Sequence, residues 1–239
     1  MSNELNINYK EYPECMFAML AAFLPQNEGD DLRRVAGDVV FRSEDSRGNT
    51  YLNGLLHSFS DRPAVVSGTR QEWYMNGLLH REGEQPAVIE GNMRQWYRNG
   101  RFHREGDRPA HYDDEVEIWY WSGLIHRDGD RPAVVVGETR SEWWVYGKRH
   151  REGDLPAIVS GNHRQWYLDG VRHRDCDLPA VVIGDRWSSW WRNGLLHRDG
   201  GRPAVINSRS YEWWVEGVIV RSSDMSMEED SLDSPSSPQ

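Results

Sequence analysis

QEWYMNGLLHREGEQPAVIEGNM, residues 71–93, decides the fold because its pattern returns every 23 or 24 residues along most of the chain. One histidine marks each copy: His57, His80, His103, His126, His150, His173 and His197. A Pro-Ala pair begins six residues after each of these histidines, at Pro63, Pro86, Pro109, Pro132, Pro156, Pro179 and Pro203. A repeat of this length predicts stacked supersecondary units that share one continuous core. Arrays of this kind usually bind other molecules rather than catalyse reactions.

An Asn-Gly pair, which occurs in four copies, predicts a β-hairpin. Asn76-Gly77 lies between an aromatic pair, Trp73-Tyr74, and an apolar pair, Leu78-Leu79, and a type I′ turn needs positive φ at both central residues. The turn glycine recurs as Gly54, Gly77, Gly100, Gly123, Gly147, Gly170, Gly194 and Gly217, and a second turn lies near Gly68, Gly91, Gly137, Gly161 and Gly184. We therefore predict a mainly β fold, an elongated antiparallel meander of repeated hairpins.

Each unit is expected to contain two strands. The first is short and ends in the aromatic pair, and the second is longer and runs from the apolar pair through Pro-Ala-Val. Proline cannot donate to a strand ladder, so the proline and the Gly-Asp before it predict a bulge or kink in the longer strand.

Two aromatic rows follow from strand alternation, which places Trp73 and Tyr74 on opposite faces. One row is Trp73, Trp96, Trp119, Trp143, Trp166, Trp190 and Trp213, and the other is Tyr51, Tyr74, Tyr97, Tyr120, Trp144, Tyr167, Trp191 and Trp214. We expect both rows to be core that joins neighbouring units. The alternative is that one row is partly exposed and forms a groove for a partner, because tyrosine and tryptophan are enriched at such surfaces.

The spacing of tryptophan, glycine and histidine resembles a variant of the MORN repeat. The signature residues are Trp73, Gly77, His80, Trp96, Gly100, His103, Trp143, Gly147, His150, Trp166, Gly170 and His173. Two features depart from that family, since arginine follows the histidine in place of glycine and the Pro-Ala pair is additional. This variant is similar to repeats of large DNA viruses and some bacteria. The resemblance implies a binding or scaffolding module of about seven units plus caps over residues 46–221.

The repeated histidines and charges predict structural contacts rather than an active site. Equivalent histidines would lie about 10 Å apart, too far to share one ion through bonds of about 2 Å. The acidic turns, such as 128–130, are expected to accept backbone N–H groups, with calcium binding as the alternative. We expect Arg81 to pair with Glu72, and Arg151 with Glu142, across their hairpins. The sequence therefore predicts no catalytic residue, no metal and no cofactor.

The end copies depart from the pattern, as the caps of an array are expected to do. Thr50 stands in place of the tryptophan and Ser58 in place of the arginine of the first copy, and Val220 stands in place of the last histidine.

Composition narrows the possible partners. The net charge is −10, but residues 51–221 carry 23 basic and 24 acidic side chains, so the array is nearly neutral. This balance lacks the basic footprint of a nucleic-acid binder. Cys15 and Cys176 are too few for a disulfide framework, and the apolar run 15–24 is about half the length that spans a bilayer. The start has no basic signal-peptide region, so we expect a cytoplasmic or nuclear location in the host cell, with no transmembrane segment.

Residues 1–45 lack the repeat and have a different pattern of apolar residues. Met16, Met19, Leu20, Phe23 and Leu24 follow helical spacing. Pro13 suits a helix start and Pro25 a stop, and residues 30–36 predict a second short helix. This segment resembles an F-box, through Tyr12-Pro13, Met16, Leu20, Leu24-Pro25, Asp31-Leu32, Arg34 and Ala36. It departs from the family in Tyr12, which replaces leucine, and in a reduced third-helix segment.

The F-box resemblance implies docking onto a Skp-type adaptor of a cullin–RING ubiquitin ligase through Pro13, Met16, Leu20, Leu24 and Leu32. The repeat array would then bind an unknown protein target, as in a non-enzymatic substrate receptor. The alternative is a structural scaffold of a virus particle or membrane-associated assembly, in which the helices only cap the array. Residues 222–239 are acidic and rich in serine and proline, a composition typical of a disordered tail.

Overall fold

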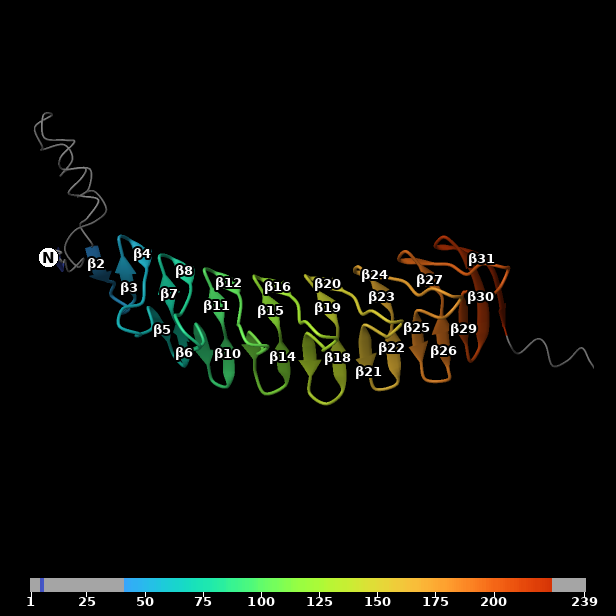
Figure 1. Ribbon diagram of the computed structural model, residues 1–239, viewed down its shortest axis with the longest axis horizontal. Helices are drawn as coiled ribbons and strands as arrows, with labels where there is room; N and C mark the ends of the chain where they lie inside the picture. Colours follow the sequence, from blue (N-terminus) through green and yellow to red (C-terminus); the bar gives the residue numbers. More distant parts are fainter. Residues whose placement is uncertain (1–4, 7–40, 225–239) are drawn as a thin grey trace, which may run out of the picture. The chain divides into compact units, whose positions relative to one another are not determined.

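The computed structural model describes residues 5–6 and 41–224, and the chain divides into two compact units, Met1–Asp114 and Glu115–Gln239 (Figure 1). All regular structure in the described residues is β-strand. The mainly β class and the antiparallel meander of hairpins are thereby confirmed. The expected helices at 12–36 and the tail from 225 onward lie outside the described residues.

Unit 1 contains thirteen described strands, β1 to β13. They are β1 (Leu5–Asn6), β2 (Phe41–Glu44), β3 (Thr50–Leu52), β4 (Leu55–Leu56), β5 (Val65–Ser67), β6 (Arg70–Glu72), β7 (Tyr74–Met75), β8 (Leu78–Leu79), β9 (Val88–Glu90), β10 (Met93–Gln95), β11 (Tyr97–Arg98), β12 (Arg101–Phe102) and β13 (His111–Tyr112). Strands β1 to β4 form one small sheet, in which β1 is parallel to β2. Strands β5, β6, β9, β10 and β13 pair in that order in a second sheet.

Unit 2 contains strands β14 to β31. They are β14 (Val116–Ile118), β15 (Tyr120–Trp121), β16 (Leu124–Ile125), β17 (Val134–Val136), β18 (Arg140–Glu142), β19 (Trp144–Val145), β20 (Lys148–Arg149), β21 (Ile158–Ser160), β22 (His163–Gln165), β23 (Tyr167–Leu168), β24 (Val171–Arg172), β25 (Val181–Ile183), β26 (Trp187–Ser189), β27 (Trp191–Arg192), β28 (Leu195–Leu196), β29 (Val205–Asn207), β30 (Ser210–Val215) and β31 (Val218–Asp224). Three-residue strands pair successively from β14 to β29, and the sheet ends in β30 and β31.

Each repeat divides its strands between two tiers, which the ribbon shows within each unit (Figure 1). The sheet tier contains the three-residue strands, and the hairpin tier contains the two-residue hairpins such as β7–β8. Trp73 separates the tiers, because its N–H donates to Ala87 O at 2.8 Å and its carbonyl accepts the His80 N–H at 3.0 Å. The core tryptophan is therefore the point at which the chain leaves the sheet and enters the hairpin.

The prediction of one longer strand from the apolar pair through Pro-Ala-Val is wrong, because the structure has two separate strands there. Residues 80–87 form a loop between β8 and β9, so the expected kink is a complete interruption. Gly83 has φ +75°, and Pro86 cannot donate to a ladder. The loop is held from within, since Arg81 Nη1 donates to Pro86 O at 3.2 Å.

The hairpin turns have the backbone predicted for type I′. Asn76 and Gly77 have φ of 49° and 79°, and Asn193 and Gly194 have φ of 50° and 84°. The turn glycine also contacts the preceding hairpin: an added Cβ at Gly77 would lie 3.5 Å from Leu55 Cδ2. Glycine is therefore required by conformation, because a Cβ at that distance would make an ordinary van der Waals contact.

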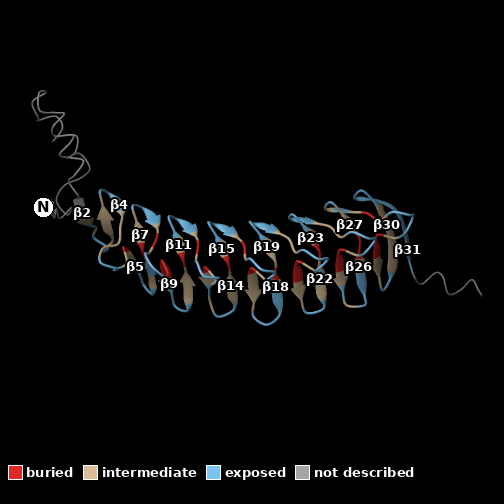
Figure 2. Cartoon of the chain, in the orientation of Figure 1, coloured by how far each residue is buried: buried red, intermediate tan, exposed pale blue. Residues whose placement is uncertain are grey.

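The core of each unit lies between the two tiers (Figure 2). It contains fully buried alanines, one from each Pro-Ala pair: Ala64, Ala87, Ala110, Ala133, Ala157, Ala180 and Ala204. The first aromatic row packs with them, and Trp73, Trp96, Trp119, Trp166 and Trp190 are all buried. This alternation of a large and a very small side chain lets successive repeats stack closely.

The last repeat is atypical, as the sequence indicated. Strand β30 continues through Trp213, which pairs with Arg221, and a register shift follows at Trp214. In the regular repeats the core tryptophan N–H donates to the carbonyl of the Pro-Ala alanine fourteen residues later. No Pro-Ala pair follows Trp213 in the sequence, and β30 and β31 pair there as one long hairpin.

Candidate functional site

Arginine, tryptophan and aspartate form the same three-part contact in most repeats, which we call the clip. In the first complete example, Arg81 lies over the Trp73 ring with its Cζ 3.8 Å from the centroid. Arg81 also donates from Nε and Nη2 to Asp61 of the preceding repeat, at 2.7 and 2.8 Å. Trp73 Nε1 donates to the carbonyl of the same Asp61 at 3.1 Å. One aspartate therefore fixes both the arginine and the tryptophan of the next repeat.

The clip recurs with little variation. Its arginine and aspartate pairs are Arg81–Asp61, Arg151–Asp130, Arg174–Asp154 and Arg198–Asp177, each with Nε to Oδ1 at 2.7 or 2.8 Å. The hydrogen bond from arginine outweighs desolvation and lowers the pKa of Asp61, Asp130, Asp154 and Asp177. These carboxylates are charged, structural groups.

The clip corrects two predicted ion pairs. Arg81 binds Asp61 rather than Glu72, and Arg151 binds Asp130 rather than Glu142. The arginine reaches back to the neighbouring repeat because its guanidinium lies flat on the core tryptophan. The turn aspartate therefore accepts from a guanidinium, where the sequence predicted backbone N–H donors.

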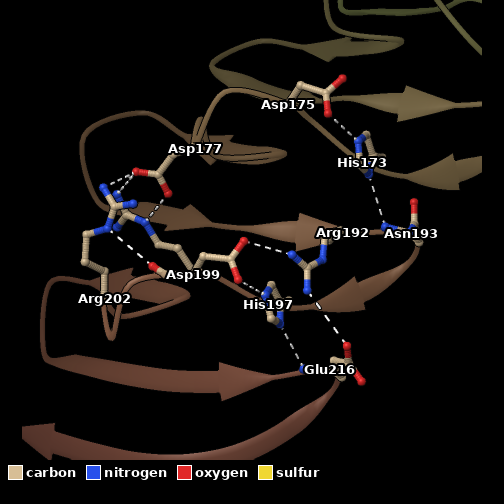
Figure 3. A network of polar contacts seen from close by, with 10 residues as sticks. His173, Asp175, Asp177, Arg192, Asn193, His197, Asp199, Arg202 and Glu216 are labelled. Carbon is tan, nitrogen blue, oxygen red and sulfur yellow. Dashed lines mark hydrogen bonds and ion pairs between the residues drawn. The ribbon is translucent and has the colours of Figure 1, made fainter.

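The repeated histidine connects neighbouring hairpins. His173 Nδ1 accepts the N–H of Asn193 at 3.1 Å, and His173 Nε2 lies 3.0 Å from Asp175 Oδ1 (Figure 3). His197 makes the same contacts with the Glu216 N–H and with Asp199 (Figure 3). Both ring nitrogens are thus engaged in structural contacts. In residues 5–6 and 41–224 no group of three or more metal-ligating side chains clusters.

The structure places the twelve signature residues in core and turns. Trp73, Trp96, Trp166, His80 and His103 are buried, and Trp143, His150 and His173 are half-buried. Gly77, Gly100, Gly147 and Gly170 occupy turns with φ of 79°, 75°, 80° and 89°. The tryptophans and histidines build the array and leave little of their own surface for a partner, whereas the four turn glycines are exposed.

The second aromatic row is half-buried and its polar atoms are satisfied. Tyr74 Oη donates to Glu72 at 2.9 Å, and burial with this hydrogen bond raises the pKa of Tyr74 to about 12. Trp144 Nε1 donates to Glu142 at 3.0 Å. The expectation that both rows are core is confirmed for the five buried tryptophans of the first row. It holds only in part for the half-buried Trp143 and Trp213 and for the second row.

A different surface carries a regular series of exposed apolar side chains. Residues on either side of each hairpin turn form cross-strand pairs, such as Met75 with Leu78 and Leu168 with Val171, and they share one face. We call this surface the hairpin face. Leu78 and Leu195 are about half exposed, and Val218 is 63% exposed. Hydrophobic side chains at this exposure, repeated in register, are typical of an interaction surface.

The hairpin face is apolar and basic. In unit 1 it contains Leu52, Leu55, Met75, Leu78, Arg98 and Arg101. In unit 2 it contains Trp121, Leu124, Val145, Lys148, Leu168, Val171, Arg192, Leu195, Val215 and Val218. None of these positions is acidic, although the chain has ten more acidic than basic side chains. Arg98 and Arg192 each bind a nearby carboxylate, at 2.8 Å.

The sequence reasoning missed the hairpin face because it looked for exposure in the aromatic pairs. The available signal was the residue on either side of the turn, whose side chain lies on the strand face opposite to its neighbour, the second aromatic row on one strand and the apolar residue that pairs with it on the other. The predicted docking residues Pro13, Met16, Leu20, Leu24 and Leu32 lie outside the described residues. Within the described residues there is no helix long and apolar enough to span a membrane.

No protein-family model, no curated protein and no solved structure matches this chain. The resemblance to MORN repeats therefore rests on the motif spacing together with the repeated hairpins, and the resemblance to an F-box rests on the sequence motif alone.

Proposed function

We propose that the chain is a non-enzymatic protein-interaction adaptor whose repeat array binds a protein target through the hairpin face. The supporting observation is the row of exposed apolar side chains in register on successive hairpins. A rigid surface with repeated apolar anchors loses little conformational entropy on binding. The lack of acidic residues on this face favours a target with apolar side chains and carboxylates.

The buried core of the array does not include this face. The core comprises the tryptophans and alanines between the tiers, and the clips tie adjacent repeats together. Exposed residues such as Leu168 and Val171 can therefore be changed with little effect on folding. A surface whose residues can be substituted without loss of the fold is suited to the selection of a target.

The N-terminal segment supplies a second, finer proposal. Its resemblance to an F-box supports docking onto a Skp-type adaptor of a cullin–RING ligase, with the array selecting the substrate. The described residues do not include this segment, so the motif alone supports the idea. A structural scaffold, virion or membrane-associated, is the competing function.

The test is affinity capture from eukaryotic lysate followed by quantitative mass spectrometry. The hairpin-face variant is Leu168→Asp with Val171→Asp. Its matched control is Val66→Asp with Ile183→Asp, which changes exposed apolar residues of the sheet tier. We expect the hairpin-face variant to lose a direct binder, confirmed with purified components, and the control to retain it. Equal retention by both variants would contradict the assignment.

The docking proposal has its own variant, Leu20→Asp with Leu24→Asp. Loss of Skp-type adaptor and cullin from the captured set, with the repeat target retained, supports a substrate receptor. If the unmodified chain captures no adaptor while the target remains, the scaffold function is favoured.

A further inference from the structure

One clip in unit 1 lacks its carboxylate. Arg104 lies over Trp96 with its Cζ 3.5 Å from the ring centroid, and its Nη1 donates to Pro109 O at 3.1 Å, as in the other repeats. In the described part of the chain, its buried Nε has no acceptor. The equivalent Nε of Arg81 and of Arg174 binds an aspartate at 2.7 Å.

The position of that aspartate is occupied by Glu84. Glu84 binds Arg108 instead, with Nη1 and Nη2 at 2.7 and 2.6 Å from its two oxygens. Asp61, Asp130 and Asp154 have left-handed φ of 57°, 50° and 54°, and Glu84 is not among the left-handed residues. Aspartate tolerates that conformation better than glutamate does. The substitution therefore changes both the backbone and the reach of the carboxylate.

Another clip shows what the arrangement can hold. Asp177 binds Arg198 through Nε and Nη2, and the same carboxylate contacts Arg202 (Figure 3). Arg202 stands in its repeat where Arg108 stands in the earlier one. One well-placed carboxylate thus satisfies two arginines, whereas Glu84 reaches only Arg108.

The Arg104 guanidinium edge that lacks a carboxylate, which we call the unfilled fork, lies at a pocket of about 310 Å³ within unit 1. Arg98, Arg104 and Arg108 line it, together with Glu84, Glu105 and Trp96. Burial and the neighbouring Arg108 lower the pKa of Arg104 and together outweigh the opposing effect of Glu84. Trp96 Nε1 still donates to Glu84 O at 2.8 Å, so the frame of the clip is intact.

We propose that this pocket binds the carboxylate of an acidic side chain on a partner polypeptide, in the place that aspartate fills in the other clips. The incoming oxygens would accept from Arg104 Nε and Nη2, the bidentate geometry that arginine provides. Arg108 and Glu84 line the site as an ion pair, and their side chains are well exposed, at 38% and 71%, so the pair rearranges at little cost. Only the delivery of the carboxylate on a polypeptide rests on the proposed function.

The test uses the full chain and follows arginine Nε–Hε signals by ¹⁵N-NMR at low ionic strength. The probes are acetate, inorganic phosphate, a short peptide with one aspartate, and the same peptide with asparagine. The Arg104 signal is assigned from Arg104→Lys. We expect the aspartate peptide to move the Arg104 signal in a saturable manner, and the asparagine peptide to leave it unchanged.

Two substitutions at position 84 provide opposite outcomes without disturbing the core. Glu84→Asp is expected to fill the fork from within and weaken peptide binding at least tenfold. Glu84→Gln removes the competing carboxylate and is expected to strengthen binding several-fold. As a matched control, Asp154→Ala empties the clip of Arg174 and should create a second site that the same peptide occupies.

Four results would contradict the proposal. The first is an Arg104 signal that no carboxylate moves in the unmodified chain. The second is unchanged peptide binding by Glu84→Asp. The third is a response to phosphate at a lower concentration than to the peptide. Saturation by acetate at the same concentration as the peptide would assign the pocket to free carboxylates and contradict the partner polypeptide. None of these results depends on the hairpin face, so failure here leaves the proposed function standing.

Discussion

His80 Nδ1 accepts a hydrogen bond from the backbone N–H of Asn99, 3.1 Å away in the turn of the next hairpin. On its other side, His80 Nε2 lies 3.2 Å from Glu82 Oε1. Because Nδ1 is the acceptor, the network assigns the proton of the neutral ring to Nε2. The histidine thus joins two hairpins through one backbone group.

His80→Phe is expected to destabilise the array by about 1–3 kcal/mol, because the ring is replaced at similar size while the Asn99 N–H loses its acceptor. Urea unfolding followed by tryptophan fluorescence measures the change. The control is His163→Phe, since His163 bonds only the side chain of Gln165 in the described contacts. Equal losses in the two variants would show that ring polarity, and not the turn contact, matters.

Acid is expected to weaken the clips. The pKa values of Asp61, Asp130, Asp154 and Asp177 are lowered in the folded chain, chiefly by hydrogen bonds from arginine. A lowered folded pKa means that the contribution is complete above the unfolded value, about 3.9, and is lost as pH falls through the folded value.

Thermal unfolding at a series of pH values between 6 and 3, spanning the usual carboxyl range near 4, checks this prediction. We expect Tm to change little above about pH 5 and to fall below about pH 4. Asp154→Asn removes one titrating group, so its decline should be shallower. A decline as steep as that of the unmodified chain would exclude the clips as its source.

The fold could be predicted from local sequence rules, whereas the contacts between repeats and the exposed hairpin face could not. Asn76-Gly77 predicts its turn because backbone conformation depends on residues adjacent in the chain. The partner of Arg81 lies twenty residues away in another repeat, and a single motif does not show which carboxylate the guanidinium reaches. The same holds for Arg104, whose unfilled fork becomes visible only beside the filled ones. The recurrence of the motif reveals the repeat, whereas the side-chain contacts between neighbouring repeats become visible only in the structure.

Glu142 provides a test of a buried charge. It is 5% exposed and accepts from Arg140, Arg149 and Trp144, at 2.8, 3.1 and 3.0 Å. Burial alone would raise the pKa of Glu142, but the hydrogen bonds from Arg140 and Arg149 outweigh it and lower the pKa.

Glu142→Gln is expected to cost about 1.5–3 kcal/mol of unfolding free energy, the value for a hydrogen bond to a charged group. The larger penalty for breaking a fully buried ion pair does not apply, because Arg140 and Arg149 are 44% and 34% exposed and can be solvated by water. Chemical denaturation measures the loss. A cost above about 3 kcal/mol would show that the arginines remain desolvated.

The turns of unit 2 allow a stabilising substitution. Glu216 has φ +48°, a conformation that costs a side chain such as glutamate roughly 1 kcal/mol and that asparagine tolerates. Its contact with Arg192 is long, at 3.8 Å, and exposed, so little is lost on its removal. Glu216→Asn should therefore raise the unfolding free energy by up to about 1 kcal/mol.

Tyr146 is the matched comparison, with φ +44° at the same position of its turn. Its ring stacks on His126 with centroids 4.0 Å apart and an interplanar angle of 16°. An aromatic pair contributes roughly 0.5–1.5 kcal/mol, which is close to the backbone strain that asparagine would relieve. Tyr146→Asn should therefore leave stability nearly unchanged while Glu216→Asn increases it, as measured by urea unfolding of both variants. An equal gain in both would mean that the stacked ring contributes nothing, and a loss in Glu216→Asn would mean that the left-handed turn carries no strain.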